Sequence, residues 1–119
     1  MTIRYMLKVD RKPTADERIF LTVPEFEGAC LKVTANGTTQ VIGWQPYEVD
    51  ITDSLAATDE VALELVLTRR NLFGPLNQLP LRAPNYGPNN WITDGESWSD
   101  DYQLWRGGLL AAPVVEVRK

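Results

Sequence analysis

Apolar and polar residues alternate along seven segments of the chain, and this period of two is typical of β-strands that bury one face. The longest apolar face belongs to segment 61–67, which is therefore predicted to be the central strand. No stretch of ten residues follows the helical period, so any helix is expected to have only one or two turns. The seven segments are 3–9, 19–23, 29–35, 47–51, 61–67, 102–105 and 115–118.

Two short motifs predict how neighbouring strands connect. Asn36-Gly37 follows segment 29–35 and suits the positive φ angles of a tight hairpin turn, which predicts a partner strand at 38–42. The run Thr52-Asp53-Ser54-Leu55 offers a capping side chain ahead of a short apolar segment, which predicts a single helical or 3₁₀ turn at a sheet corner. Asp50 and Thr52 end a strand, where their side chains can accept hydrogen bonds from nearby backbone N–H groups.

The number and spacing of these strands predict the fold class. Short strands joined by turns, with no crossover helix, indicate antiparallel sheets, because parallel strands need long connections. We therefore predict an all-β fold, a β-sandwich of roughly eight antiparallel strands. The length of 119 residues fits one ordinary domain, so the sandwich is expected to span residues 1–119 as a single domain.

Residues 69–100 interrupt the alternation of apolar and polar positions. They hold four of the eight prolines, and connections longer than about 15 residues are uncommon in compact domains. A disordered segment would be more polar, so we predict one long ordered loop that packs against another surface. Its apolar and aromatic residues include Leu72, Phe73, Leu76, Leu79, Leu81, Tyr86 and Trp91.

Composition excludes several classes of function. With 12 basic and 16 acidic residues the net charge is −4, which disfavours nucleic acid and membrane surfaces as partners, because both attract clustered Lys and Arg. The chain has no His, so His-based catalytic triads and His-containing zinc sites are excluded. The single cysteine, Cys30, excludes an intrachain disulfide, and it lies in an apolar run where we expect it to be buried. No cofactor is expected.

Four acidic residues in segment 94–101 are the strongest candidates for catalysis or calcium binding. Their spacing fits no calcium loop. Asp100 and Asp101 would point to opposite faces of an extended chain, which is wrong for two carboxyl groups that converge on one glycosidic bond. We interpret the segment as a solvated acidic loop beside Arg69-Arg70, and we expect no catalytic residue and no metal ligand. The four residues are Asp94, Glu96, Asp100 and Asp101.

Four pieces of the sequence, in this order, carry a family resemblance over residues 29–119. In these pieces the chain resembles the galactose-binding-like jelly-roll domains attached to bacterial glycoside hydrolases, of the family 2 and rhamnosidase types. It departs from the family pattern after the Gly-Pro step, where some relatives carry His and this chain has Leu76-Asn77. The four pieces are Asn36-Gly37, the run from Gly43-Trp44-Gln45-Pro46-Tyr47 to Asp50-Ile51-Thr52, segment 61–68 with Asn71-Leu72-Phe73-Gly74-Pro75, and the ending from Trp98 to Val117.

The resemblance implies both a fold and a function. The fold would be an antiparallel jelly-roll sandwich, and the chain would be a C-terminal fragment of a larger carbohydrate-active enzyme. Its function would be that of a non-catalytic accessory domain, which packs against and orients the catalytic domain of the parent glycoside hydrolase. The alternative is a carbohydrate-binding module, which recognises an oligosaccharide through aromatic stacking.

Three tryptophans are candidates for contact with a carbohydrate, because an indole offers a broad apolar face to a sugar ring. Trp44 is interpreted first as a plug at one end of the sandwich. Trp91 and Trp98 lie in or beside the long loop and are the better platforms, although packing in the core or against a neighbouring domain is the leading interpretation for both. We expect Trp98 to be buried beside strand 102–105 and Trp91 to be more exposed.

Two polar residues near the start of the loop complete the candidate set. Asn71 can bind a sugar hydroxyl, but it can also satisfy backbone groups that no longer pair in a sheet. Arg69 can pair with the acidic segment, with a sugar or with a neighbouring domain. The candidate carbohydrate-binding residues are thus Trp44, Arg69, Asn71, Trp91 and Trp98.

Overall fold

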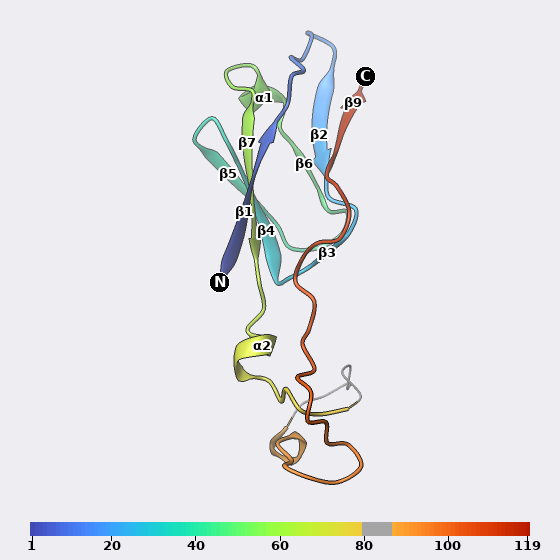
Figure 1. The fold of residues 1–119 in the computed structure, drawn as a ribbon. Helices are drawn as coiled ribbons and strands as arrows, with labels where there is room; N and C mark the ends of the chain where they lie inside the picture. The colour runs from blue at the N-terminus through green and yellow to red at the C-terminus, as the bar shows by residue number, and fades with distance from the viewer. Residues whose placement is uncertain (80–86) are drawn as a thin grey trace. The chain divides into compact units, whose positions relative to one another are not determined.

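The computed structural model describes residues 1–79 and 87–119, and its residues group into two compact units (Figure 1). The first, which we call the strand unit, contains residues 1–67 and 107–119. The second, which we call the loop unit, contains residues 68–106. The interruption predicted at residues 69–100 therefore falls within a unit of its own.

The strand unit is built from nine described strands in three sheets (Figure 1), and every strand pairing is antiparallel. The four-stranded sheet has the order β1-β7-β4-β5, the three-stranded sheet β6-β2-β9, and the smallest sheet β3-β8. The predicted all-β, antiparallel class is thus confirmed. The strands are β1 (Thr2–Lys8), β2 (Arg18–Thr22), β3 (Phe26–Glu27), β4 (Cys30–Ala35), β5 (Thr38–Ile42), β6 (Glu48–Asp50), β7 (Glu60–Val66), β8 (Gly108–Leu109) and β9 (Val114–Arg118).

The predicted central strand, β7, pairs with β1 on one side and with β4 on the other. Its residue Leu63 lies opposite Tyr5 and Val33, and it is fully buried. The inward faces of the four-stranded and three-stranded sheets contribute to one hydrophobic cluster, which is what the alternation of apolar residues requires. From β7, β4 and β2 this cluster takes Val61, Leu63, Leu65, Leu31, Val33, Ala35, Ile19 and Leu21.

The hairpin between β4 and β5 forms at the predicted turn. Asn36 and Gly37 have φ angles of 47° and 75°, the positive values that this type of turn needs. Thr34 and Thr39 lie opposite each other on the two strands, and their hydroxyls are 2.8 Å apart. The partner strand begins and ends at residues 38 and 42, as predicted.

The helical turn predicted after β6 is present as α1 (Thr52–Leu55), but the expected side-chain cap is absent. The residue at the N-cap position is Ile51, which makes no side-chain capping bond. The buried Thr52 hydroxyl is used elsewhere, because it accepts a hydrogen bond from the Ile19 N–H of β2 at 2.8 Å. It also donates to Asp50, whose Oδ1 accepts the Thr52 N–H at 2.9 Å. The corner is thus fixed by Asp50 and Thr52 accepting backbone N–H bonds, as the sequence suggested.

Two further predictions are wrong. No strand forms at 102–105, where Tyr102 and Leu104 are exposed; the Gln103 N–H bonds the Leu76 carbonyl instead of a sheet neighbour. Cys30 is only partly buried, because it lies on the face of β4 opposite the buried Leu31. An apolar alternation is therefore insufficient evidence for a strand where no neighbouring strand is available.

Asp50 connects the corner to β2, and this contact predicts how stability depends on pH. Burial alone would raise the pKa of Asp50, but hydrogen bonds from Thr52 and an ion pair with Arg18 at 2.9 Å lower it below the ordinary value. A carboxyl group with a lowered pKa stabilises the fold above its unfolded pKa, about 3.9 for Asp, and this stabilisation is lost as the pH falls through the folded value.

We expect the Asp50→Asn variant to have a smaller free energy of unfolding than the wild type near neutral pH. The difference should begin to shrink below about pH 4, where the carboxyl group of the unfolded chain takes up a proton, and it should be lost once the pH has fallen through the lowered pKa of the folded protein. Urea unfolding at a series of pH values measures both curves. Asp53→Asn, at an exposed position of α1, is the control and should follow the wild type. A constant difference between Asp50→Asn and wild type at every pH would contradict the role given to the carboxylate.

Candidate functional site

The loop unit is held together by main-chain hydrogen bonds between two segments about 20 residues apart. Gln78 and Trp98 form an antiparallel bridge. On either side of it the Leu79 N–H donates to the Ser97 carbonyl at 2.8 Å, and the Ser99 N–H donates to the Asn77 carbonyl at 2.7 Å. The unit also contains two short helices, α2 (Arg70–Phe73) and the 3₁₀ turn η1 (Pro88–Asn90). These bonds bring segments 74–78 and 90–98 together.

Asn71, a predicted sugar contact, is fully engaged with the backbone of Trp105. Its Nδ2 donates to the Trp105 carbonyl at 2.7 Å, and its Oδ1 accepts the Trp105 N–H at 2.7 Å. The amide thus pairs with Trp105 as a neighbouring strand would, which satisfies two backbone groups outside any sheet. This geometry matches the structural alternative given for Asn71 and leaves it outside the residues that line the pocket described next.

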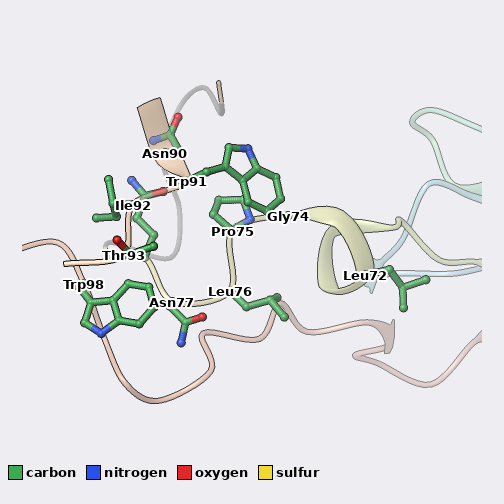
Figure 2. A pocket seen from close by; sticks show the side chains of 11 residues that line it. Leu72, Gly74, Pro75, Leu76, Asn77, Asn90, Trp91, Ile92, Thr93 and Trp98 are labelled. Carbon is green, nitrogen blue, oxygen red and sulfur yellow. The ribbon is translucent and has the colours of Figure 1, made fainter. Parts of the chain in front are cut away.

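A pocket with a volume of about 390 Å³ lies between the two segments of the loop unit (Figure 2). Two of the predicted residues, Trp91 and Trp98, line it together (Figure 2). The other described lining residues are uncharged, so they offer aliphatic surfaces with amide and hydroxyl groups among them, beside the two indoles. They are Leu72, Gly74, Pro75, Leu76, Asn77, Gln78, Asn90, Ile92 and Thr93.

The two tryptophans of the pocket differ in exposure. Trp91 is 58% exposed, so its indole is available to a partner. Trp98 is half-buried, and its Nε1 donates to Asp100 Oδ1 at 2.9 Å. As expected, Trp91 is the more exposed of the two. Trp98 is not buried beside a strand, because the strand expected at 102–105 does not form.

Trp44 lies in the strand unit, and the expectation that it plugs one end of the core is wrong. It is 82% exposed, in the connection between β5 and β6. Tyr47 packs against the core instead, with its ring in edge-to-face contact with Phe26 at a centroid distance of 4.9 Å. Trp44 borders a second hollow of about 350 Å³, lined also by Phe20, Val41 and Pro46.

Arg69 and the acidic segment are exposed and do not meet in the described part of the chain. Arg69 precedes α2, lies outside the pocket lining and forms no ion pair with another described residue. The acidic residues of segment 94–101 are exposed, in agreement with a solvated loop. Two of the loop residues named from the sequence, Leu81 and Tyr86, lie outside the described residues.

The acidic groups with perturbed pKa values belong to the strand unit rather than to the pocket. Hydrogen bonds from Thr14, reinforced by Arg11 at 2.7 Å, lower the pKa of the buried Glu17. A hydrogen bond from Arg118 lowers the pKa of Glu48. Carboxyl groups of this kind stay ionised near neutral pH, whereas a general acid needs a raised pKa. Their arrangement suits structural ion pairs.

Neither metal-binding clusters nor membrane helices were found in residues 1–79 and 87–119. No group of three or more Cys, Asp or Glu side chains there is arranged to hold a metal ion. No helix in the same residues is long and apolar enough to cross a membrane.

The amide and hydroxyl residues of the pocket were not predicted as site residues. Asn77, Gln78, Asn90 and Thr93 are residue types that are common in any loop, so their presence alone carries little information. The expected resemblance to galactose-binding-like domains drew attention only to Leu76-Asn77, as a departure from the family pattern, and assigned these two residues no role. Both of these residues line the pocket.

A scan against protein-family models, a search of curated proteins and a search of solved structures each found no match to this chain. The function must therefore be argued from the residues and their geometry.

The paired hydrogen bonds of Asn71 predict a local effect of its substitution. In Asn71→Ala the Trp105 amide loses its acceptor, so its hydrogen exchange should become about fivefold faster, since net hydrogen bonds of this kind contribute roughly 1 kcal/mol. Asn71→Asp keeps the acceptor and should retain more of the protection. Amide exchange followed by NMR measures both variants. Equal exchange rates in Asn71→Ala and wild type would show that this contact does not hold the loop unit.

Proposed function

We propose that this chain is a non-catalytic β-sandwich domain of the jelly-roll type, which docks against another protein domain through its loop unit. The observation that carries this proposal is the exposure of apolar side chains in the loop unit. Among its described residues only Pro75 is buried. Six large apolar or aromatic side chains are exposed there: Leu72, Phe73, Leu79, Trp91, Tyr102 and Leu104.

This exposure is unusual for a surface that faces only water. Soluble proteins seldom expose clustered apolar side chains, and where they do, the surface often binds a partner. The residues of the hydrophobic core, by contrast, all belong to the strand unit. The strand unit thus supplies stability, and the loop unit carries the surface for a partner.

The resemblance to accessory domains of glycoside hydrolases suggests which partner this is. In such proteins the catalytic domain of the same enzyme is the neighbour, and we take it as the partner of the loop unit. The antiparallel sheets and their shared core are compatible with a sandwich of this family, which supports the assignment. The chain would then orient the catalytic domain and take no part in the chemistry.

Replacement of Leu72 and Phe73 by Asp tests this docking. Both residues lie on α2 and are 59% and 65% exposed, so the Leu72→Asp/Phe73→Asp variant should fold normally. We expect it to bind the glycoside hydrolase catalytic domain encoded with this chain at least about tenfold more weakly, as for central apolar contacts of an interface. Isothermal titration calorimetry measures the difference.

Two residues of the strand unit provide a control that is matched in exposure. Met6 and Val41 are also 59% and 65% exposed, and Met6→Asp/Val41→Asp changes the net charge by the same amount. This control should bind the catalytic domain as the wild type does. Equal weakening by both double variants, or no binding by the wild type, would contradict docking through the loop unit.

A second function, binding of an oligosaccharide, is favoured by the pocket itself. A concave site with a 58% exposed indole and no ionisable side chain among its described lining residues suits a neutral ring that carries hydroxyl groups. Trp91 would stack on the ring, and the neighbouring amides would bond its hydroxyls. Arg69 and Asn71 are not needed in this arrangement, since neither lines the pocket.

The variant Trp91→Ala tests whether Trp91 binds a sugar or instead stabilises the fold as a buried side chain. Because the side chain is largely exposed, the variant should lose less than about 1 kcal/mol of stability, against roughly 3–5 kcal/mol for a buried Trp. Galactosides and rhamnosides titrated against tryptophan fluorescence should shift the emission of the wild type and of Trp44→Ala, but not of Trp91→Ala. If no sugar changes the wild-type emission, this second function is excluded for these sugars.

A further inference from the structure

Strand β9 lies at an edge of the three-stranded sheet, where it pairs with β2 alone among the described strands. Val115 and Val117 lie opposite Leu21 and Ile19, so they share the face that points to the core. Leu21 and Ile19 are fully buried, whereas Val115 and Val117 are 38% and 42% exposed. The core-side face of β9 is therefore incompletely covered.

The main-chain groups of Val115 and Val117 also point away from β2. On β2, the Ile19 N–H and carbonyl bond Thr52 and Ile51, on the β6 side, and the Val23 N–H bonds Tyr47. The direction of the main-chain N–H and carbonyl groups alternates from one residue to the next along a strand. The main-chain groups of the even-numbered residues of β2 therefore face β9 and bond the even-numbered residues of β9. The odd-numbered residues of β9 thus direct their N–H and carbonyl groups to the free edge.

We compare three registers in which β9 pairs antiparallel with β9 of a second copy about a two-fold axis. The registers differ in the central residue, which lies at the axis opposite the same residue of the other copy. If Glu116 is at the centre, two like charges lie directly opposite each other, which is destabilising. If Val115 is at the centre, Val117 lies opposite Pro113, which has no N–H to donate. If Val117 is at the centre, it pairs with itself through two hydrogen bonds, and each Glu116 lies opposite Arg118 of the other copy.

We propose that the free edge of β9 is a self-association surface, on which β9 of a second copy pairs antiparallel with Val117 at the centre. The complementary charges of Glu116 and Arg118 select this register and this occupant. Arg118 already bonds Glu48 and Glu116 of its own chain at 2.7 Å and lies over the Phe20 ring, so its guanidinium is held in place beside the edge. The three-stranded sheet becomes a continuous sheet across the two copies.

The association is expected to be weak, because one short strand pair buries less surface than a standard stable interface. Sedimentation equilibrium of the whole chain from about 10 μM to about 1 mM should therefore show a monomer–dimer equilibrium with a dissociation constant inside this range. A chain that remains monomeric at about 1 mM overturns the proposal.

Val117→Pro removes the central N–H without breaking a bond to β2, and proline is tolerated on an edge strand. We expect it to raise the dissociation constant at least about tenfold. The Leu72→Asp/Phe73→Asp variant, altered in the loop unit, should dimerise as the wild type does. Dimerisation that survives Val117→Pro but is lost in the loop-unit variant would overturn the proposal and would instead indicate association through the loop unit.

Charge exchange tests the register even if Val117→Pro does not fold. Glu116→Arg alone places two arginines opposite two arginines, and Arg118→Glu alone places two glutamates opposite two glutamates, so each should lose self-association. A mixture of the two chains restores opposite charges at both positions and should form a heterodimer with at least about tenfold higher affinity than either homodimer. Glu25→Lys, at an exposed position outside β9, is the charge control and should behave as the wild type. Failure of the mixture to associate overturns the proposed register.

Discussion

The pairing of β7 with both β1 and β4 is the constraint on which the rest of the structure depends. Its inward residues are fully buried, and on the other face Glu64 lies opposite Arg4 and Lys32. A shift by one residue would turn Glu64 toward the core, so the burial pattern fixes the register of the whole sheet. Gly28 packs so closely on Leu65 that an added Cβ would come within 2.5 Å of its side chain, which fixes the approach to β4 as well.

The sequence was sufficient for those parts of the fold that are determined by local signals and one-sided burial. The Asn36-Gly37 hairpin, the central place of β7 and the positions of most strands follow from such signals, whereas the two-residue strands β3 and β8 were not predicted. The predictions for Trp44 and segment 102–105 were wrong because both depend on tertiary contacts. Tyr47 packs against the core with Phe26 while Trp44 is exposed, and Gln103 pairs with no strand among the described residues. Local pattern cannot report which neighbours a residue will meet.

The candidate site was only partly predictable for a related physical reason. Its tryptophans could be named, because large aromatic side chains in an irregular loop need a surface to contact. The shape of the pocket could not be predicted, because it depends on main-chain hydrogen bonds between residues 77–79 and 97–99. No pattern of side chains in the sequence indicates these bonds. The same holds for Asn71, whose partner Trp105 lies 34 residues away.

The ends of the loop unit explain how one chain can keep a stable core and still expose an apolar surface. Leu67 and Gly107, the residues next to its two ends, belong to the strand unit and approach closely: a Cβ added to Gly107 would lie 3.0 Å from the Leu67 side chain. The chain therefore enters and leaves the loop unit at neighbouring positions, and all residues of the hydrophobic core lie in the strand unit. Because loop-closure entropy grows slowly with loop length, such an insertion costs the fold little. The exposed apolar side chains of the loop unit are thus separate from the core residues, so a substitution among them removes no side chain of the core.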